Sequence, residues 1–169
     1  MTATHRLLIA TACVVGALAV PPAQAAEWTA LWGGADGAHN LALAWQSAPI
    51  WRSGRGARPL DVSLEASAGR FSRDGDSTWH VGLTPILRWW MTPSNAIEAG
   101  IGANLLSSTY IGPKGMATAY QFGDSIGLVH RFEASPWSAG VRFSHYSNAG
   151  IKHPNPGQNF LQLRLSYDY

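Results

Sequence analysis

The sequence predicts one all-β domain, an eight-stranded antiparallel transmembrane β-barrel of the outer membrane. Three observations predict it: an N-terminal export segment, few charged residues combined with many Trp and Gly, and repeated alternation of apolar residues. Charged residues make up 13% of the 169 residues, which also include 8 Trp and 18 Gly, whereas soluble domains average about 25% charged residues. After the export segment, no apolar run approaches the ~20 residues of a spanning helix. These features are typical of an exported membrane β-barrel.

Residues 1–25 have the order of a secretory signal peptide. A basic start at Arg6 precedes an apolar run, and Ala23-Gln24-Ala25 supplies the small residues of a cleavage site. We therefore expect residues 1–25 to be removed and residues 26–169 to form the barrel. The single cysteine, Cys13, lies in the signal peptide, so the mature chain does not depend on disulfides.

Alternation of apolar and polar residues, interrupted by turn residues, predicts the strands. The expected strands cover 27–34, 41–45, 60–68, 79–89, 97–105, 120–128, 138–148 and 161–169. Short turns are expected at 91–95 and 133–136, and longer polar loops at 71–77, 107–117 and 149–158. With both termini in the periplasm, the short turns lie inside and the long loops outside the cell.

The sequence must also decide which face of the barrel meets lipid. A soluble lipocalin-like barrel, the alternative, would turn its apolar face inward. The polar face carries the charged residues Asp61, Glu65, Arg88, Glu98, Arg142 and Arg164. These suit a polar, cross-paired lumen better than an apolar cavity. Aromatic residues near strand ends fit interfacial girdles: Trp51, Trp89, Trp90, Tyr110, Trp137 and Tyr169.

The seventh expected strand carries the residues with the clearest chemistry. Because side chains alternate along a strand, Val141, Phe143, His145 and Ser147 share one face. If that face meets lipid, a histidine and a serine there are costly and indicate a functional site. Residues two apart lie ~6.6 Å apart at the backbone, so the imidazole can reach the hydroxyl. The alternative is that both residues lie hydrated at the membrane interface.

The stretch that begins at this pair, HYSNAGIKHPNPG at 145–157, resembles the signature of the lipid A 3-O-deacylases of the PagL family. The resemblance implies an outer-membrane ester hydrolase that removes the 3-hydroxyacyl chain at position 3 of lipid A. It implies lipopolysaccharide as the substrate. Topology independently places the site in the outer leaflet, because with a periplasmic N-terminus the seventh strand rises outward and the pair lies near its extracellular end. The resemblance implies no metal and no other cofactor. By the same resemblance, Ser147 is the nucleophile, His145 the general base and Asn148 the oxyanion-stabilising amide.

The third member of the site departs from the family pattern. The family places a Glu just after this stretch to orient the histidine, whereas this chain has Gln158 and Asn159 there. Strand parity favours Asn159, because it shares the outward face with the pair. An alternative acid is Asp124: if Ile126 pairs with His145, Asp124 lies opposite Ser147 on that same face.

The missing Glu keeps a second function open, a non-catalytic small barrel that serves adhesion or membrane integrity. The net charge of +2 is too small to indicate a nucleic-acid partner. Whether the barrel is a monomer or a homodimer is left open by the sequence.

Overall fold

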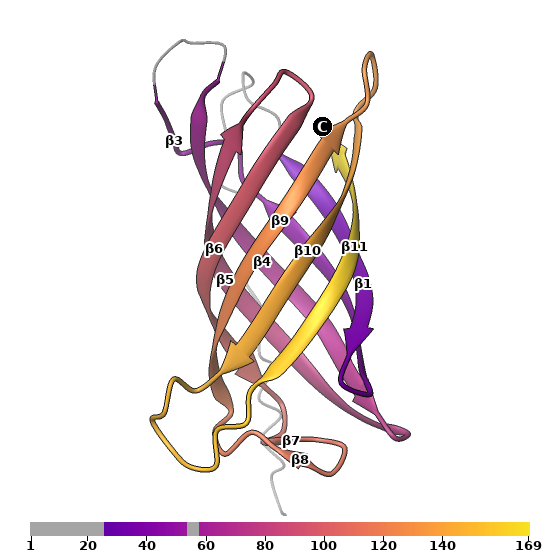
Figure 1. Cartoon of the computed structure of the whole chain (residues 1–169), viewed down its shortest axis with the longest axis vertical. Coiled ribbons are helices and arrows are strands. Elements are labelled where there is room, and N and C mark those ends of the chain that lie inside the picture. The colour runs from indigo at the N-terminus through magenta and orange to yellow at the C-terminus, as the bar shows by residue number, and fades with distance from the viewer. Residues whose placement is uncertain (1–25, 54–57) are drawn as a thin grey trace, which may run out of the picture.

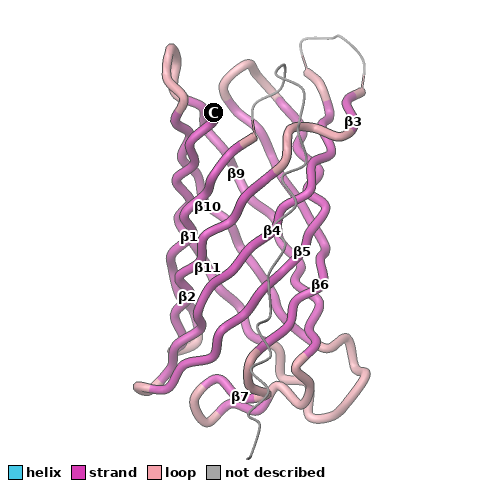
Figure 2. Tube along the Cα trace, turned by 180° about the vertical axis from the view of Figure 1, so that it is seen from behind, coloured by secondary structure: helices cyan, strands magenta, loops and turns pink. Residues whose placement is uncertain are grey.

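The chain folds into a closed antiparallel barrel of eight long strands (Figures 1 and 2). This computed structural model describes residues 26–53 and 58–169, so the predicted signal peptide lies outside the described residues. The barrel strands are β1 Glu27–Ala35, β2 Ala38–Gln46, β4 Leu60–Arg73, β5 Asp76–Trp90, β6 Asn95–Leu106, β9 Tyr120–Arg131, β10 Trp137–Ser147 and β11 Gln158–Asp168. Strands consecutive in this series pair, and β1 pairs with β11, which closes the barrel. The predicted fold class is confirmed.

The connection between β4 and β5 is tighter than the sequence suggests. The expected loop over residues 71–77 is wrong: β4 and β5 continue through it and are joined by the two-residue turn Asp74-Gly75. Both turn residues have positive φ, 51° and 86°, as a two-residue hairpin turn requires. The polar residues around this turn belong to strand ends, which is why they resemble a loop in the sequence.

The two ends of the barrel differ. At one end, here called the terminal end, the first described residue meets the C-terminus, because the Tyr169 amide donates to the Ala26 carbonyl at 3.1 Å. The other end, here called the loop end, carries the connections 107–119 and 148–157 (Figure 1), whereas the described residues 47–53 and 58–59 between β2 and β4 lie at the terminal end. The 107–119 connection contains the short strands β7 (Tyr110–Ile111) and β8 (Lys114–Gly115).

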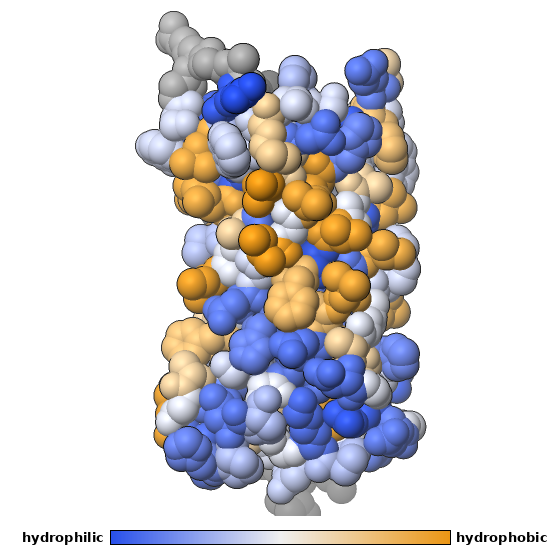
Figure 3. Space-filling model, in the orientation of Figure 1, coloured by the Kyte–Doolittle hydropathy of each residue, from blue (hydrophilic) through white to orange (hydrophobic). Residues whose placement is uncertain are grey.

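Apolar side chains cover the outside of the barrel. Exposed and buried residues alternate along every long strand, and the exposed ones are mainly Leu, Ile, Val and aromatic residues. Figure 3 shows apolar side chains gathered around the middle of one face and hydrophilic ones over the loop end. This arrangement excludes the lipocalin-like alternative. The described residues include no helix long and apolar enough to cross a membrane.

A buried ion network fills the lumen. Glu98 accepts hydrogen bonds from Arg88, Arg142 and Arg164 at 2.8–3.1 Å, and Glu65 accepts two more from Arg142 at 2.8 Å. The predicted cross-paired lumen is therefore present, and its charges are neutralised by partners on other strands.

Trp90 corrects the predicted girdle. The sequence places it at the membrane interface, but its ring points inward with 6% of its surface exposed. Its indole N–H donates to an Asp61 carboxylate oxygen at 3.0 Å. Its neighbour Trp89 takes the outward position, since adjacent strand residues face opposite sides.

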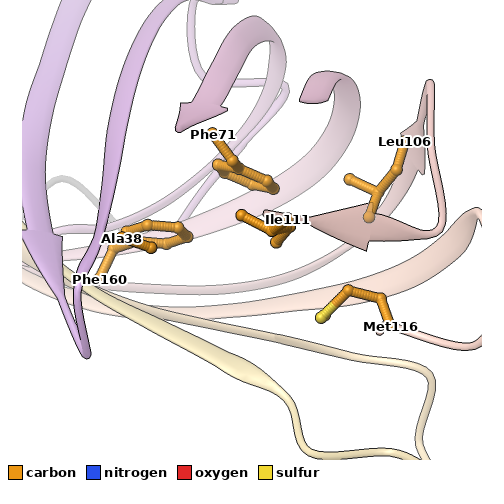
Figure 4. Close-up of a cluster of buried hydrophobic side chains, with 6 residues drawn as sticks. All are labelled: Ala38, Phe71, Leu106, Ile111, Met116 and Phe160. Carbon is orange, nitrogen blue, oxygen red and sulfur yellow. The ribbon is translucent and has the colours of Figure 1, made fainter. Parts of the chain in front are cut away.

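A small apolar core closes the lumen at the loop end. It consists of Ala38, Phe71, Leu106, Ile111, Met116 and Phe160 (Figure 4). Ile111 and Met116 come from the 107–119 connection, so this core fastens that connection onto the barrel. The Tyr146 ring packs against the core, with its centroid 4.9 Å from that of Phe71. Tyr146 thus anchors the inward side of β10 between His145 and Ser147, the last residues of this strand that face outward.

Candidate active site

The last outward residues of β10 are His145 and Ser147. Val141 and Phe143 are 40% and 45% exposed, whereas Arg142 and Ser144 are buried, so odd-numbered residues of this strand face outward. His145 and Ser147 continue that row and are half-buried. The predicted pair therefore lies on the outer wall of the barrel, where its apolar surface ends toward the loop end.

Asn159 and Gly157 fix the imidazole of His145. The Nδ1 atom lies 2.7 Å from the Asn159 Oδ1 atom, and the two residues are in register across β10 and β11. Because this oxygen only accepts hydrogen bonds, Nδ1 carries the proton and Nε2 keeps its lone pair. A Cβ atom on Gly157 would lie 2.5 Å from the imidazole Cε1 atom, so only glycine allows this close approach.

Of the two residues expected to orient the histidine, Gln158 and Asn159, only Asn159 contacts it. Gln158 is fully buried, and its amide donates to the Ala35 and Asn159 carbonyls. Its Oε1 atom accepts a hydrogen bond from Lys114 at 3.0 Å. Gln158 therefore supports the backbone of Asn159 from inside the barrel.

Lys114 ties the 107–119 connection to this support. Burial lowers the pKa of Lys114, while the nearby Asp36 carboxylate raises it and the Arg73 guanidinium lowers it further. A chain of hydrogen bonds thus runs from Lys114 through Gln158 and Asn159 to His145.

Ser147 ends β10, and its hydroxyl makes no hydrogen bond to any residue that the structure describes. Among the described residues, no hydrogen bond joins it to His145. Two residues of strand separate the backbones by ~6.6 Å, a span that rotation of both side chains can bridge. Such contacts are commonly long in the absence of substrate and tighten when it binds.

An apolar groove of about 720 Å³ runs from His145 over the outer wall across β4, β5, β6, β9 and β10. Its polar lining comes from His145, Asp124 and Ser125. Its apolar lining is supplied by Val62, Pro85, Leu87, Ala99, Ile101, Ile126 and Phe143. The reactive pair therefore lies beside an open, apolar channel rather than in an enclosed pocket.

Comparison with known proteins identifies the family. The family model for lipid A 3-O-deacylase (PagL) matches residues 25–168. A lipid A deacylase PagL of Bordetella bronchiseptica is 37% identical over 145 residues, which cover 82% of this chain and 80% of the relative. This chain belongs to the lipid A 3-O-deacylase (PagL) family.

Two further comparisons extend this result. A lipid A deacylase PagL of Pseudomonas aeruginosa is 31% identical over 160 residues, which cover 89% of this chain and 91% of the relative. A crystal structure of the outer membrane enzyme PagL matches with a TM-score of 0.75 at 26% identity, over 83% of this chain and 98% of that one. The predicted family, enzyme class and outer-membrane localisation are confirmed.

In this PagL-family chain, Asp124 approaches the histidine from the side opposite Asn159. The expected register, with Ile126 opposite His145, is wrong by two residues. The structure pairs Asp124 with His145, and Ile126 with Phe143. A shift of two residues keeps every side chain on its face, so the apolar pattern fits both registers. The tight turn between β9 and β10 selects the one observed.

Asn148 does not have the free amide that the PagL resemblance implied. It is fully buried, and its Nδ2 atom donates to the carbonyls of Lys152, at 2.8 Å, and Met116, at 3.3 Å. Its Oδ1 atom accepts from the Gly150 amide at 2.9 Å. Both donor hydrogens are therefore committed to the shape of the loop after Ser147.

Asn155 is the residue that the sequence did not single out. Its Oδ1 atom accepts from the Asn148 backbone amide at 3.0 Å, and its side chain is half-buried. Within the described residues its Nδ2 group has no protein partner. Its position in the family stretch, after Pro154, was the available signal, but its orientation depends on the folded loop.

No group of three or more His, Cys, Asp or Glu residues in the described part of the chain is arranged to hold a metal ion.

Proposed function

We propose that this chain hydrolyses the ester at position 3 of lipid A with Ser147 as nucleophile and His145 as general base. The observation that carries the proposal is an outward His145, fixed by Asn159, at the polar end of an apolar groove on the outer wall. Family membership supplies the substrate class, because the relatives are lipid A deacylases.

The reaction proceeds in two acyl-transfer steps. Nε2 of His145 accepts the Ser147 proton as Oγ attacks the ester carbonyl carbon, which forms a tetrahedral intermediate. Collapse breaks the bond to the sugar oxygen, which takes the proton from Nε2 and leaves as an alcohol. Water then attacks the acyl-serine with His145 again as base. The 3-hydroxy fatty acid leaves and Ser147 regains its proton.

Asn155 is the side chain best placed to stabilise the oxyanion. Its Nδ2 group has no partner among the described residues, and its Oδ1 atom accepts a hydrogen bond from the backbone amide of the residue that follows Ser147. Loss of one oxyanion donor lowers kcat by about 10²–10³-fold in serine hydrolases. Asn155→Ala should therefore reduce turnover strongly, whereas Asn148→Ala should act by loosening the loop.

Asn159 and Asp124 divide the work of the family's Glu in this proposal. Asn159 holds the tautomer of His145 through a neutral hydrogen bond, as an amide does in Cys-His-Asn sites. It cannot stabilise the imidazolium by charge. Asp124, in register with His145 on β9 and lining the same groove, supplies the negative charge for that state.

The groove accommodates the acyl chain. Its apolar lining replaces membrane hydrocarbon around the chain, and its polar end holds the ester beside His145. With the terminal end in the periplasm, the loop end lies outside and the site faces the outer leaflet. Lipopolysaccharide then reaches Ser147 without leaving the membrane.

Expression in a Gram-negative host and mass spectrometry of its lipid A test the proposal. We expect loss of one 3-hydroxyacyl unit with the wild-type chain and none with Ser147→Ala or His145→Ala. Heat-modifiable migration on gels shows that each variant is folded. Unchanged lipid A with a folded, inserted wild-type barrel would instead favour the non-catalytic alternative.

A further inference from the structure

Two charged side chains face outward in the described barrel strands, Asp124 on β9 and Arg70 on β4. The other charged residues of these strands occupy the inward positions of the alternation. Asp124 belongs to the site described above. Arg70 does not, because β4 and β10 are four strands apart in either direction around the barrel.

Arg70 lies at the edge of the apolar surface. It is exposed between two large apolar residues, Leu41 and Trp79, which are 66% and 62% exposed. The next outward row toward the barrel centre is Leu43, Ala68 and Val81, and the next toward the loop end is His39, Ser72 and Ser77. Arg70 is therefore in the first polar position beyond the apolar belt.

The active site occupies the equivalent level of the opposite wall. Ile126, Phe143 and Leu161 form an apolar row. The next outward row toward the loop end is Asp124, His145 and Asn159. An ester bond of a membrane-embedded lipid A must lie at that row for the proposed reaction. Lipid A phosphates, which are attached to the same sugars, then lie close to the level of Arg70.

Arg70 has no counter-charge within the part of the chain that the structure describes. Its outward neighbours are apolar residues, serines and His39. The nearby acid Asp74 pairs with Arg73 instead, with 3.7 Å between the Asp74 Oδ2 and Arg73 Nε atoms. Arg73 occupies an inward position in the alternation of β4. No ion pair of Arg70 occurs within the described residues. A cation at the edge of hydrocarbon is costly without a partner, and guanidinium binds phosphate through paired hydrogen bonds.

We propose that Arg70 binds a phosphate of a second lipid A molecule in the outer leaflet, on the wall opposite the active site. The guanidinium donates to the phosphate, and the Trp79 ring lies at the interface beside the headgroup. Acyl chains pass along the small outward side chains Ala66 and Ala68. This bound lipid fixes the depth of the barrel in the membrane. The proposal shares the orientation of the barrel with the proposed function, but it does not depend on hydrolysis.

Native mass spectrometry of the full-length mature barrel with purified lipid A tests this site. The Ser147→Ala background prevents consumption of the lipid. We expect Arg70→Gln to retain one lipid A fewer and to bind that molecule on the order of tenfold more weakly. Arg58→Gln, which removes an exposed arginine at the terminal end, is the matched control and should bind as the parent does.

Dephosphorylated lipid A separates phosphate binding from apolar packing. With that probe, the Arg70→Gln and parent barrels should bind equally. Equal binding of phosphorylated lipid A by the Arg70→Gln and Arg58→Gln barrels would overturn the proposal. Efficient disulfide capture of a second copy through Ser72→Cys would also overturn it, because this wall would then be a homodimer contact. Heat-modifiable migration confirms folding in every case.

Discussion

At the residue scale, the imidazole of His145 is held by a neutral amide rather than by a carboxylate. The Asn159 oxygen occupies the orienting position at 2.7 Å from Nδ1, but it adds no negative charge. The nearest carboxylate in the strand register is that of Asp124. The chemistry of this family member is therefore expected to depend on two neighbours where a glutamate alone would act.

Placing a carboxylate at residue 159 tests whether Asn159 orients His145 while Asp124 supplies the charge. Asn159→Glu should raise kcat on the order of tenfold, because a charged hydrogen bond stabilises imidazolium more strongly than a neutral one. The rate of 3-hydroxy fatty acid release from lipid A in mixed micelles measures the effect. Asn159→Ala should lower the rate, since Nδ1 then loses its partner. A rate for Asn159→Glu at or below that of the parent would contradict the assignment.

Asp124→Asn tests the proposed contribution of the Asp124 charge to the stability of the His145 imidazolium. We expect kcat to fall about tenfold in the parent, which corresponds to ~1.4 kcal/mol of lost transition-state stabilisation. In the Asn159→Glu background, kcat should fall less. Both backgrounds are assayed for fatty acid release under the same conditions. Equal losses in the two backgrounds would mean that Asp124 acts independently of the imidazole charge.

Gly157→Ala tests the packing of the imidazole. The added Cβ would lie 2.5 Å from Cε1 of His145, at a backbone φ of 62°, so the ring must leave its observed position. A displacement of this kind can cost on the order of 100-fold in rate. Gly75→Ala is the control, because it has the same left-handed strain, at φ 86°, with nothing within 4 Å. It should retain activity, as measured by lipid A deacylation of folded protein.

At the scale of elements, alternation predicted the strands and their faces, but not their lengths or mutual positions. Strand β4 continues to Arg73 past the apolar surface, where polar residues resemble a loop. The register between β9 and β10 differs by two residues from the expected one. The alternation of side chains could not distinguish the two registers, because a shift of two residues keeps every side chain on the same face. His145 and Ser147 could be found from parity and motif. The engaged amide of Asn148 could not, because its partners meet only in the folded loops.

The 107–119 connection should influence the site through its core residues. Ile111 is fully buried in the loop-end core, so Ile111→Ala should lower the free energy of unfolding by about 2–4 kcal/mol. Activity should fall as well, since Met116 of this connection accepts a hydrogen bond from Asn148. Urea unfolding in lipid vesicles and deacylation assays measure both effects. Ile151→Ala, at a residue that is 66% exposed, should leave stability nearly unchanged.

At the scale of the whole molecule, side chains fill the lumen of the barrel, so it is not an open pore. Glu98 joins three arginines from three other strands, so the network links opposite sides of the lumen. Glu98→Gln would leave these buried guanidinium groups with one carboxylate fewer. We expect it to destabilise the barrel by about 3–5 kcal/mol, measured by urea unfolding in vesicles. The neutral substitution Gln162→Leu, at a buried uncharged lumen position, should cost less.

The groove opens sideways along the wall, so substrate supply is two-dimensional. The relevant concentration is the mole fraction of lipopolysaccharide in the leaflet, not its amount per volume of solution. Diluting the substrate with inert lipid or detergent therefore slows turnover at constant bulk concentration. An effective inhibitor must itself partition into the leaflet, and a water-soluble analogue of the sugar headgroup alone would not reach Ser147 in the proposed binding mode.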